Sequence, residues 1–277
     1  MQMKGGNINY LSKYLNNLQS QGRYTFLKSN AIADLNTNFI AYRKAAHRLI
    51  RKKRLARIKS DFYVIVPLEY YSLGCPPASW FIDDLVQHLN VPYYVGLLTA
   101  AAIHGAGHQQ ANVFQVVTNK IIRPIKKGEL QIDFVYLKFL EKMPTIKMKT
   151  PTGYMNVSTP EVTAYDLVRY LSRAAQINNV ATVLMELSEK LDAKKLLEIA
   201  QNTPLEISVV QRLGYLLDYL NSGIETDDLA KFIEERNNYK YIPLVTAKRA
   251  IISEKKVNYD RDSRWKIIIN EKIEPDL

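Results

Sequence analysis

Basic and polar side chains between positions 37 and 59 have the chemistry needed to bind nucleic acid. Arginine and lysine pair with phosphate oxygens, and together with asparagine they also hydrogen-bond to base edges in the major groove. Most of these residues lie off the apolar stripe of a predicted helix. We therefore expect a DNA-binding surface made by Thr37, Asn38, Arg43, Lys44, His47, Arg48, Arg51, Lys52, Lys53, Arg54, Arg57 and Lys59.

The charge of the chain supports this expectation. The net charge is +11, and residues 1–70 hold 13 lysines and arginines against three acids. This excess favours a polyanionic partner, because basic side chains that neutralise phosphates release condensed counterions. The alternative is a solvated surface that only keeps the protein in solution. Residues 71–277 are nearly neutral, with a net charge of +1. Residues 160–235 mix acids and bases, so nucleic acid is not their obvious ligand.

One set of acidic and basic residues could do hydrolytic chemistry. A metal-dependent nuclease needs converging carboxylates, usually with a lysine. Asp133 lies in the strand-like segment QIDFVYL, Glu129 precedes it by four residues, and Lys147 and Lys149 lie in the next predicted strand. Residues four apart on a strand share a face. However, Glu129 falls in the turn after Lys127, and no acidic-x-Lys signature follows Asp133, so the nuclease is the weakest of the hypotheses.

Histidine and cysteine give no stronger signal for catalysis. His104 and His108 are four residues apart, but two intervening glycines and the lack of a third ligand argue against zinc. Cys75 stands beside two prolines, and no motif identifies a base for it. No phosphate-binding loop, dinucleotide fingerprint or nucleophile elbow occurs. We expect no catalytic residue, no metal, no cofactor and no enzymatic activity.

Nothing in the sequence predicts export or membrane insertion. The N-terminal residues MQMKGGNINYLSKYL lack the apolar core of a signal peptide. The longest charge-free apolar stretch, Val91–Ile103, is shorter than the roughly 20 residues that cross a bilayer. The single cysteine cannot form an intramolecular disulfide. We expect a cytoplasmic protein with no membrane partner.

Three helices and a hairpin must position the basic residues. The apolar spacing predicts helices over residues 9–18, 29–35 and 39–53. The core-facing residues of the third are expected to be Phe39, Tyr42, Ala46, Leu49 and Ile50. Residues 55–59 and 62–66 read as strands around a turn at Ser60 and Asp61.

This order is typical of a winged helix-turn-helix. In that fold the helix after the turn, here residues 39–53, enters the major groove. The residues expected to face bases are Thr37, Asn38, Arg43, Lys44 and His47. The basic residues from Arg48 to Arg54 would meet phosphates, and the hairpin, including its turn, would meet the backbone or the minor groove. A module of this shape could also serve as a protein-docking domain.

The expected fold class is α+β, with the winged helix-turn-helix followed by a mixed α/β domain that is largely helical toward its end. We expect the first domain over residues 1–70, a linker over 71–77 containing Gly74, Pro76 and Pro77, and a second domain over 78–277. Its part 78–158 is mixed, and 159–277 is mainly helical with a final strand. The predicted helices cover residues 79–89, 95–104, 160–173, 180–190, 193–201, 205–220 and 226–235. The predicted strands cover residues 113–118, 131–136, 145–150, 154–158 and 265–270.

Several segments, spread over nearly the full length, resemble one family. They are TFLKSNAIADLNTNFIAYRKAAHRLIRKKRLARIKSDFYVIVP, PYYVGLLTAAAIHGAGHQQANVFQVVTNK, IDFVY, STPEVTAYDLVRY and RWKIIIN. In this order and spacing the chain resembles the AbiEi-type antitoxins and transcriptional regulators of type IV toxin–antitoxin systems. One departure is the hairpin turn, where Lys59, Ser60 and Asp61 stand in place of a glycine that family members often carry.

The resemblance implies a role in phage defence. It implies an N-terminal domain that binds inverted repeats in operator DNA and represses its own operon. It also implies a C-terminal domain that counteracts a co-encoded nucleotidyltransferase-type toxin, with direct contact left open. Residues 160–235 are where we expect any partner contact. The alternative is a DNA-binding transcription factor whose C-terminal domain senses a ligand or forms oligomers.

Overall fold

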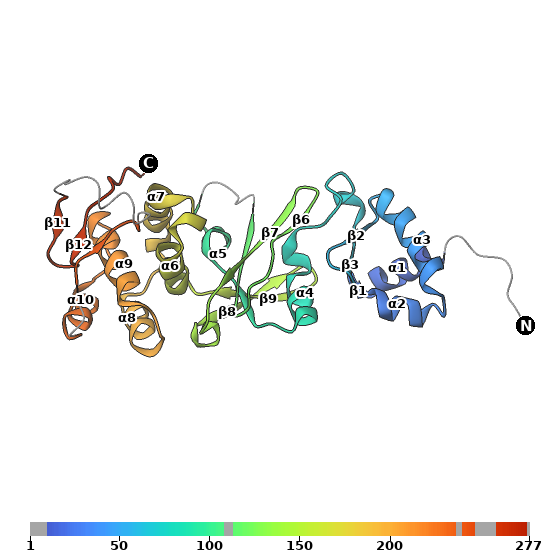
Figure 1. Cartoon of the computed structure of the whole chain (residues 1–277), viewed down its shortest axis with the longest axis horizontal. Helices are drawn as coiled ribbons and strands as arrows, with labels where there is room; N and C mark the ends of the chain where they lie inside the picture. The colour runs from blue at the N-terminus through green and yellow to red at the C-terminus, as the bar shows by residue number, and fades with distance from the viewer. Residues whose placement is uncertain (1–9, 108–112, 237–239, 247–258, 276–277) are drawn as a thin grey trace, which may run out of the picture.

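The computed structural model describes residues 10–107, 113–236, 240–246 and 259–275, and its helices and sheets follow one another along the long axis of an elongated α+β molecule (Figure 1). The first unit contains three helices and three short strands. These are α1 (Tyr10–Ser20), β1 (Thr25–Leu27), α2 (Lys28–Asp34), α3 (Phe39–Arg51), β2 (Leu55–Arg57) and β3 (Phe62–Ile65). The strands form an antiparallel sheet in the order β1-β3-β2.

The apolar stripe of α3 builds the core of this unit. Tyr42, Ala45, Ala46 and Leu49 recur at helical spacing and are buried against Leu11, Leu15 and Leu18 of α1. Phe39 was expected to face this core, and that expectation is wrong because the side chain is 51% exposed. The residue is the first of the helix, so it projects past the end of the core although its angular position fits the stripe.

The small sheet is shared between two cores. Along β3, Tyr63 and Ile65 pack with the helices of the first unit, whereas Phe62 and Val64 belong to a second cluster. This alternation follows the period of two in a strand. The second cluster also contains Cys75, which is buried, so the irregular segment 71–77 is packed against the hairpin sheet rather than extended in solvent.

A six-stranded mixed sheet occupies the middle of the molecule (Figure 1). Its strands are β4 (Tyr93–Val95), β5 (Phe114–Thr118), β6 (Ile125–Lys127), β7 (Leu130–Tyr136), β8 (Thr145–Thr150) and β9 (Gly153–Ser158), in the order β6-β7-β5-β4-β9-β8. Two helices lie beside it, α4 (Ile82–Leu89) and α5 (Leu97–Ile103). The predicted helix over 95–104 therefore loses its first residues to β4, which pairs with β5 and β9.

The break between β4 and α5 falls at Gly96. A Cβ there would lie 2.8 Å from Cγ2 of Val117 and 3.0 Å from Cε2 of Tyr94, so the backbone approaches β5 more closely than a larger residue allows. Gly96 is therefore required by packing, which the sequence pattern alone did not reveal.

Beyond the sheet the described chain is mainly helical. The helices are α6 (Pro160–Arg169), α7 (Gln176–Ser188), α8 (Ala193–Asn202), α9 (Ile207–Tyr219) and α10 (Asp227–Glu234). Short 3₁₀ helices span Leu68–Tyr70, Ala78–Trp80, Leu140–Lys142 and Leu171–Arg173. The predicted strand over 265–270 is confirmed only at β12 (Ile267–Ile268), which lies between β10 (Ile242–Pro243) and β11 (Arg261–Asp262). No helix that the structure describes is both long enough and apolar enough to span a membrane.

Candidate nucleic-acid interface

Both ends of α3 are fixed by local hydrogen bonds. At its start, Oδ1 of Asn38 accepts a hydrogen bond from the backbone N of Ala41 at 2.9 Å. At its end, Lys53 has a φ of +54°, and the backbone N atoms of Lys53 and Arg54 donate to Ile50 O and Leu49 O at 2.9 Å each. This is the Schellman arrangement of a helix C-terminus. The helix is therefore a defined platform for its outward side chains.

The outward face of α3 is basic. Ile40, Arg43, Lys44, His47 and Arg51 recur at helical spacing, and all five are exposed. An open hollow is lined by Arg43, Lys44, His47 and Arg48. In the part of the chain that the structure describes, no carboxylate forms an ion pair with these four residues. The positive charge is thus available to an external anion.

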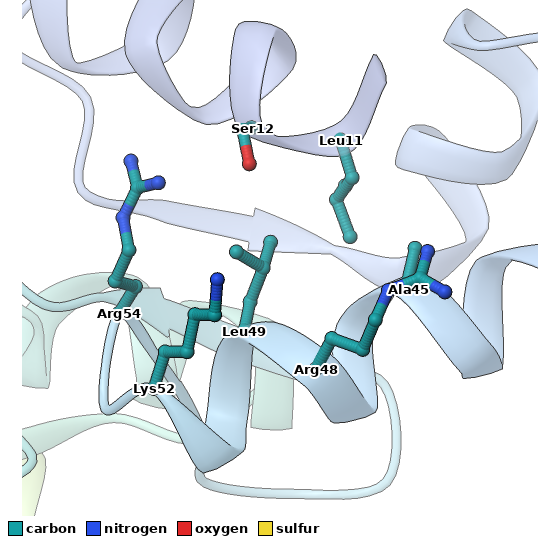
Figure 2. A pocket seen from close by; sticks show the side chains of 7 residues that line it. All are labelled: Leu11, Ser12, Ala45, Arg48, Leu49, Lys52 and Arg54. Carbon is teal, nitrogen blue, oxygen red and sulfur yellow. The ribbon is translucent and has the colours of Figure 1, made fainter. Parts of the chain in front are cut away.

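A second hollow lies between α1 and the end of α3. Figure 2 shows Leu11 and Ser12 on one helix facing side chains from the other. Its lining also includes Ala45, Arg48, Leu49, Lys52 and Arg54. Arg48 lines both hollows, so the two form one continuous basic surface along α3.

Two residues that were expected to contact phosphates have hydrogen-bond partners within the chain. Nζ of Lys53 donates to the backbone O of Ser72 at 2.7 Å. Arg54 is half-buried, and its Nε donates to Oη of Tyr71 at 3.0 Å while its Nη2 donates to Asn16. Both residues follow the last turn of α3, where the chain bends back toward the segment after the hairpin. Both side chains connect the end of α3 to the segment that contains Tyr71 and Ser72. A count of basic residues in the sequence could not predict these contacts.

Two predicted base contacts are also partly occupied. Asn38 uses its carbonyl oxygen to cap α3, which leaves its amide hydrogens for other partners. Thr37 is half-buried in the turn, and its backbone N donates to Ile32 O at 3.2 Å. These residues shape the start of the helix, whereas Arg43, Lys44 and His47 are fully exposed beside it.

The hairpin turn is anchored on α2. Arg57 is exposed on β2 and Lys59 is half-buried at the turn. Asp61 was expected to meet DNA with the rest of the turn, and its side chain accepts hydrogen bonds from Ser29 and forms an ion pair with Lys28. Neither Lys59 nor Ser60 nor Asp61 has a positive φ, so this turn does not need the glycine found in the resembling family.

The residues considered for a nuclease do not converge. Oδ2 of Asp133 accepts a hydrogen bond from Nη1 of Arg173 at 2.6 Å. Lys147 lies on β8, and three strands separate β8 from the β7 strand that carries Asp133. Glu129 is exposed in the turn before β7. No cluster of three or more metal-binding side chains occurs among the residues described.

The remaining candidates for chemistry have structural roles. Nε2 of His104 lies 2.8 Å from the backbone O of Ser158, which joins the end of α5 to β9. His108 falls outside the described residues. Burial raises the pKa of the Cys75 thiol to about 12, which disfavours the reactive thiolate.

A buried polar cluster near the end of α6 was not predicted. Asp166 is fully buried, and its Oδ2 accepts a hydrogen bond from Oη of Tyr94 at 2.8 Å. Nη1 of Arg169 lies 3.6 Å from its Oδ1, while Nη2 of the same arginine contacts Glu206 at 2.6 Å. Burial raises the pKa of Asp166 to about 6, and Arg169 and Tyr94 oppose the shift. The i, i+3 spacing of Asp166 and Arg169 is the one sequence signal that could have indicated this pair.

Comparison with known proteins places a family model on the middle of the chain. Residues 94–219 match the model described as the AbiEi antitoxin C-terminal domain, which confirms the resemblance to AbiEi-type antitoxins. The matched segment runs from β4 to the end of α9 and includes the Asp166 cluster. No curated protein matches the chain.

A solved structure shares the fold over almost the whole length. It is the crystal structure of RV2827C protein from Mycobacterium tuberculosis, with a TM-score of 0.61 and 12% sequence identity. The alignment covers 96% of this chain and 92% of that one. At this identity the similarity concerns the fold alone.

Proposed function

We propose that the chain is a two-domain autoregulating antitoxin of the type IV class. The match of residues 94–219 to the AbiEi antitoxin C-terminal domain supports the antitoxin part. The N-terminal domain, residues 1–70, binds inverted repeats in operator DNA and represses its own operon. The C-terminal domain, residues 78–277, counteracts a co-encoded nucleotidyltransferase-type toxin in the cytoplasm. Neither activity requires the chain to catalyse a reaction.

The observation that carries the DNA-binding part is the basic face of α3, where Arg43, Lys44, His47 and Arg48 form no ion pair with any described carboxylate. Helices α2 and α3 are joined by a short polar turn, and the β2–β3 hairpin follows, which is the order of a winged helix-turn-helix. In this proposal α3 enters the major groove with its N-terminal end toward the bases. Arg43, Lys44 and His47 then face base edges, and Arg48, Arg51 and Lys52 face phosphates.

The hairpin has a smaller part in this proposal. Arg57 is exposed on β2 and reaches the backbone, with Lys59 beside it at the turn. Lys53 and Arg54 drop out of the DNA contact because both are engaged within the chain. Thr37 and Asn38 act by setting the start of α3, and a substitution there changes sequence preference more than affinity.

Charge reversal tests the DNA-binding part. A duplex covering the DNA upstream of the chain's own operon is titrated with the protein across a series of salt concentrations. The R48E, R51E and K52E triple variant should lose binding and show a flatter salt dependence. The reason is that three phosphate contacts are lost and the three new carboxylates repel the phosphates. The matched control reverses three exposed lysines of the C-terminal domain, Lys147, Lys149 and Lys194, and should bind almost as wild type. Equal binding of the two triple variants contradicts the proposed surface.

Co-expression tests the antitoxin part. The proposal predicts a neighbouring gene for a nucleotidyltransferase-like protein whose expression stops growth. The full-length chain should restore growth, and so should the triple variant when expressed from an unrelated promoter, since its C-terminal domain is unchanged. Failure of the wild-type chain to restore growth would eliminate the antitoxin function.

The alternative, a ligand-sensing or oligomerising transcription factor, is distinguished by gene order. An open groove between β8 and α8 offers it a place for a ligand, with a lining that includes Pro144, Ile146, Pro160, Ile199 and Lys195. A chain with no toxin gene beside it, and with operator binding that a small molecule releases, would favour this alternative.

A further inference from the structure

Two apolar side chains are exposed on the first turn of α3. Phe39 is 51% exposed and Ile40 is 59% exposed. Ile40 shares the outward face with Arg43, Lys44 and His47, at spacings of three, four and seven residues. Single exposed apolar residues are common on protein surfaces, but these two lie on the first turn of the helix that the proposed docking places in the major groove.

The surroundings of Phe39 are cationic. Nζ of Lys28 lies 5.6 Å from the centroid of its ring, and Cζ of Arg43 lies 5.9 Å from it. Two positive charges therefore lie near the ring, at the N-terminal end of α3, which the proposed docking directs into DNA. A second copy of the chain would bring the same cations to a symmetric contact, which is unfavourable, whereas a polyanion matches them.

We infer that Phe39 and Ile40 read thymine in the operator through its C5-methyl group. This inference rests on the proposed DNA-binding function and deepens it, because it assigns a specificity to the same helix. The thymine methyl is the apolar group that bases present in the major groove, and the N-terminal residues of the inserted helix lie nearest to the bases. The basic residues on either side then pair with phosphates and polar base edges. The operator therefore contains thymines beneath the start of α3.

Uracil substitution isolates the methyl group. Two duplexes with the upstream sequence are synthesised, one with thymine and one with deoxyuridine at every thymine position, and binding is followed by fluorescence anisotropy. Wild-type protein should bind the uracil duplex more weakly, by roughly fourfold for each methyl contacted. Ile40→Ala and Phe39→Ala should bind the thymine duplex more weakly and lose most of the difference between the duplexes. Their salt dependence should stay as wild type, because no charge is removed.

Ile121→Ala provides the matched control. Ile121 is 88% exposed and lies between β5 and β6, so its truncation should leave both affinities unchanged. The inference is overturned if wild type binds both duplexes equally, or if the Phe39 and Ile40 variants keep the wild-type difference. Variants that bind DNA normally but no longer restore growth would instead assign the two residues to a protein partner. If wild type shows no salt-dependent binding to the thymine duplex, the DNA-binding function itself is refuted. This result differs from one in which wild type binds both duplexes equally, which refutes only the reading of thymine.

Discussion

The carboxylate of Asp61, in the hairpin turn, accepts hydrogen bonds from Ser29 at the start of α2. The backbone N of Ser29 lies 3.3 Å from Oδ1 and its Oγ lies 3.1 Å from Oδ2. The backbone O of Asp61 also accepts from the N of Lys28 at 2.8 Å. An acidic group at a helix N-terminus satisfies free N–H groups and meets the positive end of the helix dipole. The turn is therefore held against α2 and is not a free wing tip.

Asp61→Ala should lower the free energy of unfolding by about 1 kcal/mol, the usual effect of losing a cap. The variant should still bind operator DNA, because an acid is removed from beside a basic surface. Urea denaturation measures the first effect and anisotropy the second. Ser60→Ala is the control, since Ser60 is exposed in the same turn. Equal stability of the two variants would show that the contact with Ser29 contributes nothing.

Arg51 and Arg54 should respond differently to truncation although they are three residues apart. Arg51→Ala should reduce the slope of log affinity against log salt by about one and leave stability unchanged, since the side chain is exposed. Arg54→Ala should keep the wild-type slope and lower stability by about 1 kcal/mol, because hydrogen bonds to Tyr71 and Asn16 are lost. Measuring both quantities for both variants checks the assignment. A reduced slope for Arg54→Ala would return that residue to the DNA contact.

These contrasts show what the sequence could predict. The apolar stripe of α3 and the strands around Ser60 are local patterns, and the structure places them within a few residues of their predicted limits. The exposure of Phe39 was missed, because helical spacing gives an angle around the axis but not where the neighbouring elements end. Lys53 and Arg54 were assigned to DNA because charge was counted, whereas their partners Ser72 and Tyr71 depend on how the chain folds back.

The Asp166 cluster could not be assembled from the sequence for the same reason. Tyr94 and Glu206 lie 72 and 40 residues away from Asp166, and only the packing of β4 and α9 on α6 brings them together. The short strands β10 and β11 were missed because two residues give no periodicity. Long-range pairing decided these features, while local propensity decided the long helices.

Asp166→Asn should remove part of the pH dependence of stability. The folded-state pKa of Asp166 is about 6, above the roughly 3.9 of an unfolded chain, because the carboxyl group is fully buried. Between these values the folded state binds more protons than the unfolded state, so stability falls as the pH rises. The loss is on the order of 3 kcal/mol and is complete at about pH 7, one unit above the folded-state pKa.

Denaturation of wild type and Asp166→Asn at pH 4, 5, 6 and 7 measures this effect. The stability of wild type relative to the variant should be greatest at pH 4, should decline through pH 5 and 6, and should level off near pH 7. Asp228→Asn, at a carboxylate whose side chain is 78% exposed, serves as the control and should follow wild type. A difference between wild type and Asp166→Asn that does not vary with pH would contradict the raised pKa.

Gly214 and Trp265 should be coupled, because a methyl group at position 214 would overlap the six-membered ring of Trp265. Trp265 is 1% exposed and its Nε1 donates to Oδ2 of Asp218 at 2.6 Å, so the ring has little room to shift. Alanine favours a helix over glycine by about 1 kcal/mol. Overpacking costs about 1–3 kcal/mol or more, so Gly214→Ala should be destabilising overall.

Trp265→Phe replaces the indole with a smaller ring and should be destabilising alone, since the hydrogen bond to Asp218 is lost. The double variant should be more stable than the sum of the two single effects predicts. Urea denaturation of the four proteins completes the cycle, and strict additivity would mean that the C-terminal segment does not pack on α9 as described.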